Sequence, residues 1–173
     1  MRSFFTFPNP VNEVAARSVA AGVFVLSVTT FVLSIAVSES FLWLTLVLAI
    51  GFALRVAAGP KLSPLGQFAT RVAAPAIGHA KSVPGPPKRF AQALGLTMSL
   101  VAFVLFLVGA HVAALVFVAF VIVASFLESA LAFCLGCTLF AALMKAGIIP
   151  EDVCEACANW GAGANAVSSN AVS

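Results

Sequence analysis

Charged residues are scarce in this chain. Only 9% of its 173 residues are charged, whereas 62% are apolar, and a soluble domain carries about 25% charged residues. With a mean hydropathy of +1.11, too little polar surface is available to cover a water-soluble globule. The same figures exclude intrinsic disorder, which needs much charge and few apolar residues. The composition therefore predicts an integral membrane protein, and the length allows a single domain, which we place at residues 1–160.

Four apolar runs are long enough to cross a hydrocarbon core of about 30 Å. They cover residues 18–37, 41–59, 91–108 and 112–144. Because the breaks after the first and third runs are very short, consecutive helices are expected to be antiparallel neighbours. The sequence thus predicts an all-α, polytopic membrane protein with four transmembrane helices in two hairpins. Small residues spaced four apart in the third run (Ala91, Gly95 and Ser99) favour a close approach of helices.

The distribution of lysine and arginine predicts the orientation. With four spans, all nine basic residues lie on one side, and the two short loops on the other side carry only Glu39 and His111. The positive-inside rule then places both termini in the cytoplasm of a cell (inner) membrane. Arg55, near the end of the second run, is expected to reach the interface with its long side chain. A cleaved signal peptide ending near Ser38 is the alternative, but seventeen residues precede the first run.

The segments outside the spans carry weaker patterns. Within the central connection, residues 60–90, apolar residues recur at near-helical spacing, which predicts a short helix in the inner membrane interface; a loop over the end of the bundle is the alternative. Pro150, followed by two acidic residues, is typical of a helix start and predicts a short cytoplasmic helix over residues 150–160. The tail, residues 161–173, contains only Gly, Ala, Asn, Val and Ser and is expected to be disordered.

All four cysteines fall into two CxxC pairs, Cys134 with Cys137 and Cys154 with Cys157. Cys134 is about 33 Å along a continuous helix from the start of the fourth run, which puts it near the inner membrane face. Spacing of i, i+3 places both sulfurs of a pair on one helical face. If the predicted C-terminal helix folds back against the end of the fourth run, the four sulfurs come together.

Two kinds of chemistry fit this arrangement. Four thiolates can bind Zn or Fe tetrahedrally, or the pairs can carry out thiol–disulfide or sulfur-transfer reactions. A reducing compartment disfavours permanent disulfides, and cysteines that merely fill space would not arrive as two CxxC pairs. Because Cys134 and Cys137 are predicted to lie inside a helix, they lack the N-terminal placement that lowers a thiol pKa. That placement slightly favours the metal site.

Glu128 lies inside the fourth run, where an ionisable side chain is a functional candidate by default. On a continuous helix Cys134 and Cys137 are about 240° and 180° away around the axis, so Glu128 is not expected to act as a base for either thiol. The alternative is a structural role as a neutral carboxyl hydrogen-bonded near Ser125 and Ser129.

Two segments carry a resemblance to a known family: residues 87–95, at the start of the third run, and Phe133-Cys-Leu-Gly-Cys137, with residues 9–12 and 61–65 fitting more loosely. The chain resembles a bacterial family of small four-span integral membrane proteins of unknown function, often encoded beside thioredoxin-like and rhodanese-type proteins. This resemblance implies a link to thiol or sulfur metabolism. The second cysteine pair looks like an extension present in part of that family.

We therefore expect a membrane-embedded thiol–disulfide or sulfur-handling protein. Its cytoplasmic double-CxxC centre would exchange with a soluble thioredoxin- or rhodanese-like partner, through Cys134, Cys137, Cys154 and Cys157. The main alternative is a non-catalytic accessory subunit of a membrane complex, in which a four-cysteine site with Zn or Fe pins the cytoplasmic hairpin. A transporter of small sulfur compounds is a third reading. Contact with the lipid bilayer is expected, and no nucleic-acid partner is.

Overall fold

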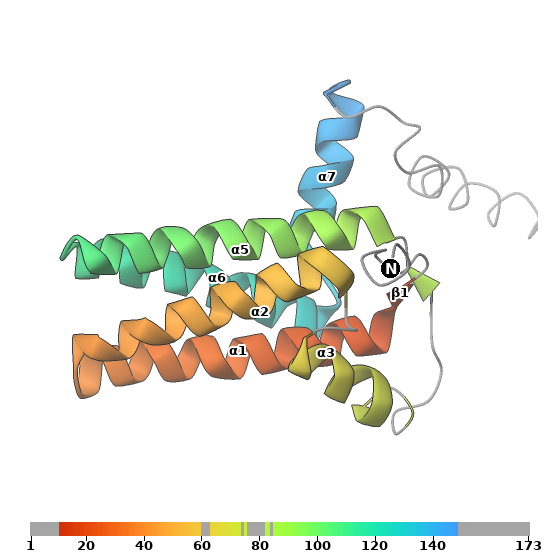
Figure 1. Ribbon diagram of the computed structural model, residues 1–173. Coiled ribbons are helices and arrows are strands. Elements are labelled where there is room, and N and C mark those ends of the chain that lie inside the picture. The colour runs from red at the N-terminus through yellow and green to blue at the C-terminus, as the bar shows by residue number, and fades with distance from the viewer. Residues whose placement is uncertain (1–10, 60–62, 74, 76–81, 84, 149–173) are drawn as a thin grey trace, which may run out of the picture.

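Four long apolar helices form the body of the protein in a computed structural model that describes residues 11–59, 63–73, 75, 82–83 and 85–148 (Figure 1). They are α1 (Glu13–Ala36), α2 (Leu44–Ala58, entered through the 3-10 turn η2, Glu39–Trp43), α5 (Gly85–Leu107) and α6 (His111–Leu131). All four segments are long and apolar enough to cross a membrane. The prediction of an all-helical chain with four candidate spans is confirmed at this level.

The four helices pack side by side, and the most extensive contacts join distant parts of the chain. Helix α1 lies along α6, α2 lies along α5, and α5 also contacts α6. A Cβ atom added to Gly95 of α5 would overlap the ring of Phe52 in α2, and Ser99 is buried. The predicted close approach at the small-residue stripe of the third run is therefore confirmed at Gly95, where the missing side chain makes room for an aromatic ring.

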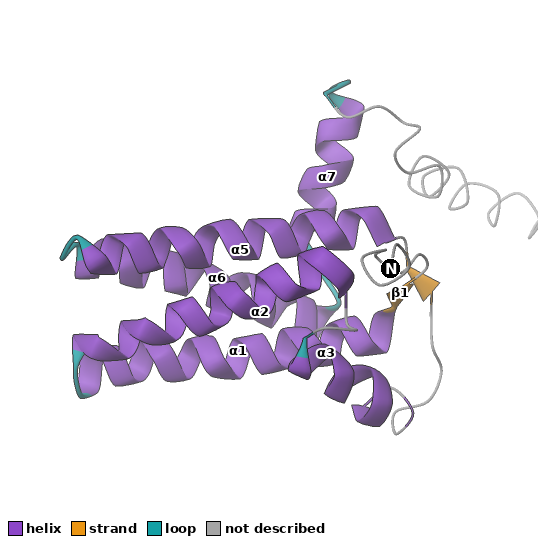
Figure 2. Ribbon diagram, in the orientation of Figure 1, coloured by secondary structure: helices purple, strands orange, loops and turns teal. Residues whose placement is uncertain are grey.

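Short polar contacts define how the helices begin. Asn12 caps α1, because its side-chain oxygen accepts hydrogen bonds from the backbone N–H groups of Val14 and Ala15. The strand β1 (Val11–Asn12) pairs antiparallel with β2 (Ser82–Val83) (Figure 2). This pairing, which the sequence analysis did not predict, holds the start of α1 beside the start of α5.

Part of the central connection is helical. The helix α3 (Pro64–Phe68) continues into the single π-helical segment η4 (Ala69–Ala73), and Ser63 caps α3 by accepting from the N–H of Gly66. Both segments contact α1. Helical structure thus occurs where an interfacial helix was predicted, although α3 itself is only five residues long.

The prediction of one continuous helix over residues 112–144 is wrong. Helix α6 ends at Leu131, Ala132 takes a left-handed conformation with φ 55°, and a separate helix α7 (Leu135–Lys145) follows. Arg17 of α1 caps the end of α6 by donating to the backbone oxygens of Ser129 (3.0 Å) and Ala130 (3.2 Å). As a result α7 leaves the bundle across its long axis (Figure 1). The apolar pattern runs through the break because α7 is itself apolar.

We expect Ala132→Gly to stabilise the protein by about 1 kcal/mol, because glycine adopts the left-handed conformation without the steric cost that a Cβ brings. The measurement is the thermal unfolding midpoint in detergent. Ala113→Gly, inside α6, is the matched control and should lower the midpoint, since glycine weakens a helix interior. A lower midpoint for Ala132→Gly would contradict the assigned turn.

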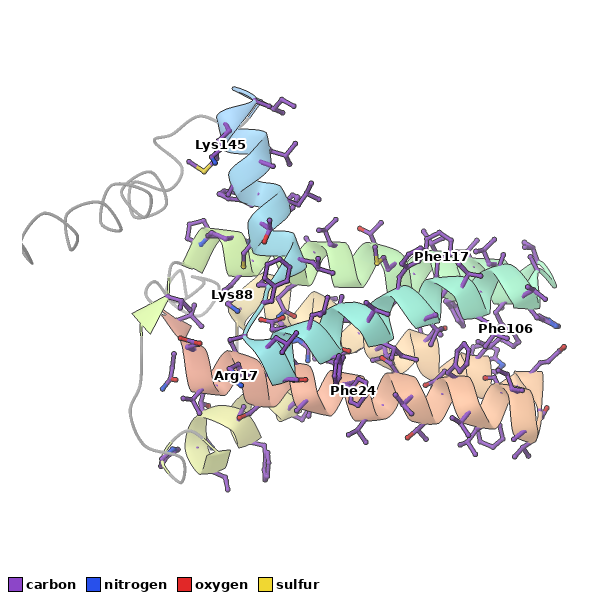
Figure 3. The ribbon with its side chains drawn as sticks, turned by 180° about the vertical axis from the view of Figure 1, so that it is seen from behind. Arg17, Phe24, Lys88, Phe106, Phe117 and Lys145 are labelled. Carbon is purple, nitrogen blue, oxygen red and sulfur yellow. The ribbon has the colours of Figure 1, made fainter. Side chains whose placement is uncertain are left out.

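The two ends of the bundle differ in charge. Arg17, Arg55, Lys88 and Arg89 lie at the end from which α7 departs, which we call the basic end, and Figure 3 shows Arg17 and Lys88 there with Phe106 at the opposite end. At the opposite end Glu39 forms an ion pair with His111. Among the residues that the structure describes, Arg17, Arg55, Lys88 and Arg89 thus lie at one end of the bundle, as the charge pattern predicts. The predicted helix 150–160, the tail 161–173, Cys154 and Cys157 all lie outside the described residues.

Candidate functional site

Cys134 is the N-cap of α7, and this corrects the expectation that the first cysteine pair lies inside a helix. Its backbone is extended (φ −92°, ψ 102°), and its sulfur accepts a hydrogen bond from the N–H of Cys137 at 3.3 Å. Both cysteines are free thiols. A thiolate is stabilised at a helix N-terminus by the unpaired N–H groups and the helix dipole. The first CxxC pair thus has the placement that favours thiol chemistry.

Gly136 fixes the first turn of α7 against α5. A Cβ at this position would lie 2.5 Å from both Cα and Cβ of Ala91, so only glycine allows this approach. One turn further on, the buried Phe140 contacts Phe90, with ring centroids 5.6 Å apart. The glycine of the Cys-Leu-Gly-Cys motif therefore allows the start of α7, with its two thiols, to pack against α5.

Gly136→Ala is expected to destabilise the docking of α7 by about 1–3 kcal/mol, the usual cost of inserting a methyl group into a close contact. Cys134 is buried, and weaker docking of α7 should expose its sulfur to solvent. We therefore expect faster alkylation of Cys134, measured by peptide mass spectrometry. Gly51→Ala in α2 is the control, since its new Cβ would meet only the Arg55 guanidinium at 3.8 Å. Equal alkylation rates in both variants would contradict the role of Gly136.

Glu128 forms an ion pair with Lys88 of α5, at 2.6 Å between Oε1 and Nζ (Figure 3 labels Lys88). The two side chains are only 14% and 11% exposed. The expected neutral carboxyl beside Ser125 and Ser129 is not observed, since both serine hydroxyls donate to backbone oxygens of their own helix. Glu128 also acts electrostatically on Cys134, but no hydrogen bond joins the carboxylate to either described thiol, so the expectation that Glu128 is not their base stays a prediction.

Arg55 is buried. The prediction that its side chain extends to the membrane interface is wrong. It is 4% exposed, its Nε donates to Gln92 Oε1 at 2.9 Å, and its guanidinium lies 4.6 Å from the centroid of the Phe52 ring. The second span thus ends with a cation held inside the bundle. Within the part of the chain that the structure describes, no carboxylate pairs directly with Arg55, and Glu128 acts on it at longer range.

The buried charges at the basic end act on Cys134 in opposite directions. The carboxylate of Glu128 raises the pKa of the Cys134 thiol, and the ammonium group of Lys88 lowers it. The Glu128–Lys88 ion pair therefore places opposing charges near the sulfur.

The two thiols have opposite pKa shifts. The thiol of Cys137 donates to the Cys134 sulfur and lowers the pKa of Cys134 below its ordinary value, against the opposing effects of burial and of the Glu128 carboxylate. Donating that hydrogen bond raises the pKa of Cys137 well above the ordinary thiol value, and burial adds to the rise. Of the two thiols, Cys134 thus has the lower pKa.

A cavity of about 260 Å³ adjoins the thiol pair between α1, α2, α5, α6 and α7. Its polar lining comes from Gln92, Ser125 and Glu128. Cys134 also lines the cavity, whereas Cys137 does not. The remaining lining is almost entirely apolar. The reactive sulfur thus borders a space that suits an apolar reactant.

The predicted four-sulfur metal site falls partly outside the described residues. Over the described ranges, no group of three or more His, Cys, Asp or Glu side chains is arranged to hold a metal ion. Sequence reasoning missed Lys88, Gln92 and Gly136 as site residues. The proline-rich start of α5, which places Lys88 in its first turn at the basic end, is the signal that could have indicated the first of them.

Four apolar helices with a buried ion pair and a helix-capping thiol are consistent with a multi-pass membrane protein. The family model for a domain of unknown function (DUF4395) matches residues 11–145, and the chain belongs to this family. The match includes Glu128, Cys134 and Cys137 and ends before Cys154 and Cys157. No curated protein matches the chain, and no solved structure does.

Proposed function

We propose that the protein is a membrane thiol–disulfide exchange protein whose reactive centre is the Cys134–Cys137 pair. The observation that carries the proposal is the position of Cys134, which caps α7, accepts the N–H of Cys137 and lines an apolar cavity. A structural cysteine in an apolar core has no need of these features. The partner we propose is a soluble protein of the thioredoxin or rhodanese type.

The exchange follows from the two different thiols. The Cys134 thiolate attacks a disulfide sulfur of the partner, forms a mixed disulfide and releases the other partner sulfur as a thiolate. Cys137 then gives up its proton and attacks the Cys134 sulfur. An internal disulfide forms, the second partner sulfur leaves as a thiolate, and the partner has gained two electrons. The reverse sequence reduces the internal disulfide.

Membrane orientation and the second pair complete the proposal. The basic end, with α3 and η4 beside it, would face the cytoplasm of a cell (inner) membrane, because positively charged loops are retained there. Both termini would then lie on that side. Cys154 and Cys157 would pass electrons between the soluble partner and the membrane-side pair Cys134–Cys137.

The first test is a metal analysis of the detergent-purified protein by elemental mass spectrometry, paired with a free-thiol count on the same sample. We expect no stoichiometric metal and four reactive thiols, falling as mild oxidation closes the pairs. Full reduction should restore the count. About one Zn or Fe per chain, with thiols reactive only after chelation, would contradict the proposal and support a metal-pinned accessory subunit.

A further inference from the structure

Several apolar side chains that line the cavity beside Cys134 are exposed. Phe120 and Val123 of α6 are 55% and 53% exposed, and Leu135 and Leu139 of α7 are 42% and 45% exposed. Helix α6 is long and apolar enough to cross a membrane, whereas α7 is apolar but shorter. Exposed apolar side chains on α6 would face lipid, so a reactant dissolved in the bilayer can reach the cavity from this side.

The residues that line the cavity extend along the bundle. Its lining on α6 runs from Phe120 to Glu128, about 12 Å at 1.5 Å per residue. Cys134 and Gln92 lie near one end of this lining, at the basic end, and Met98 and Phe120 lie toward the middle of the bundle. A flat ring could lie beside the sulfur with an attached hydrocarbon tail directed toward the lipid.

Gln92 contributes a side-chain amide to the lining of the cavity. Arginine can only donate, so the contact with Arg55 Nε requires the amide oxygen of Gln92 to face Arg55. The amide nitrogen is then turned elsewhere, and in the described part of the chain it makes no hydrogen bond. A donor in an apolar cavity beside a dithiol suits a carbonyl oxygen, whereas a lipid acyl chain would leave it unsatisfied.

We propose that the cavity binds a lipid-soluble quinone, which oxidises the Cys134–Cys137 pair; this inference rests on the proposed thiol–disulfide function. The Cys134 sulfur adds to a ring carbon, and the electron pair moves to the carbonyl oxygen bound by Gln92. Cys137 loses its proton and attacks the Cys134 sulfur, so the S–S bond forms and the C–S bond breaks. Both electrons stay on the ring, and the two thiol protons end on its two oxygens, which yields the hydroquinone.

The experiment uses full-length protein carrying Cys154→Ser and Cys157→Ser, so that only the first pair reacts. The reduced protein, in phosphatidylcholine nanodiscs under anaerobic conditions, is mixed with decyl-ubiquinone. Absorbance measures quinone loss, and alkylation with mass spectrometry measures the thiols of Cys134 and Cys137. We expect one hydroquinone for each disulfide formed.

Two variants of α6 test whether the cavity is the site. Ala124 lines the cavity, so Ala124→Phe should fill it and slow quinone reduction at least tenfold. Ala113→Phe, on the same helix but outside the lining, is the matched control. This variant should reduce the quinone as fast as the parent protein that carries only the two serine substitutions. If Ala124→Phe reduces the quinone at the control rate, the reaction occurs outside the cavity and the inference is overturned.

A parallel reaction with a water-soluble aromatic disulfide separates the two proposals. A pair that exchanges with this disulfide but does not reduce the quinone overturns the quinone inference and leaves the exchange function standing. A pair that reacts with neither overturns both. Reaction with both, together with the Ala124→Phe effect, supports a quinone site.

Discussion

Cys137→Ser is expected to arrest the protein as a stable mixed disulfide, whereas Cys134→Ser should form none. In the proposed exchange Cys134, whose pKa is lowered, attacks first, and Cys137 supplies the thiol that resolves the intermediate. Without Cys137 the attached partner cannot be released. The measurement is the intact mass of each variant after reaction with a water-soluble disulfide, with Cys154 and Cys157 both replaced by serine.

The pH dependence of alkylation gives an independent check on the same assignment. Because the pKa of Cys134 is lowered, its alkylation by iodoacetamide should reach half its maximal rate at a lower pH than that of an ordinary thiol. The control is Cys137→Ala, which removes the donated thiol hydrogen bond and should move the midpoint of Cys134 upward. A trapped adduct on Cys137 in the Cys134→Ser protein, or an unshifted midpoint, would reverse the two roles.

Lys88→Met is expected to have the largest effect on stability. It leaves the carboxylate of Glu128 without its ion-pair partner at 2.6 Å in a site where both side chains are almost covered. Removing one partner of a buried ion pair costs about 3–5 kcal/mol, because the remaining charge is buried without compensation. The measurement is the unfolding midpoint in detergent, with thermal or denaturant melts followed by circular dichroism.

Two comparisons isolate the ion pair. The double variant Lys88→Met with Glu128→Leu removes both charges, and we expect it to be more stable than Lys88→Met alone. Arg89→Met changes the neighbouring exposed cation, whose Nε donates to the Val56 carbonyl, and should have a small effect. An additive double variant would show that Lys88 and Glu128 do not stabilise each other.

The same variant links the ion pair to the thiol. Lys88 lowers the pKa of Cys134, and Glu128 raises it. Loss of Lys88 should therefore slow alkylation of Cys134 at neutral pH, as long as the variant stays folded. The ion pair thus has two roles, since it holds α5 against α6 and adjusts the charge beside the reactive sulfur.

Composition and charge alone determined the class of the protein and the number of its spans. Each of the four apolar runs overlaps one helix that is long and apolar enough to cross a membrane, because a helix that crosses lipid must be apolar over about 20 residues whatever its neighbours are. The location of basic residues at one end follows from the same counting. The choice of Cys134 and Cys137 as candidate site residues also came from the sequence, since two CxxC pairs account for all four cysteines.

Only the tertiary structure decided how the first pair is placed. Apolar periodicity reports contact with lipid or core, and it continues through the left-handed turn at Ala132, where alanine gives no local signal of a break. The capping of α6 by Arg17, the Lys88–Glu128 pair and the approach of Gly136 to Ala91 join residues 40 or more positions apart. Such contacts depend on how helices pack in space. They separate α6 from α7, so that Cys134 caps α7 instead of lying inside one continuous helix.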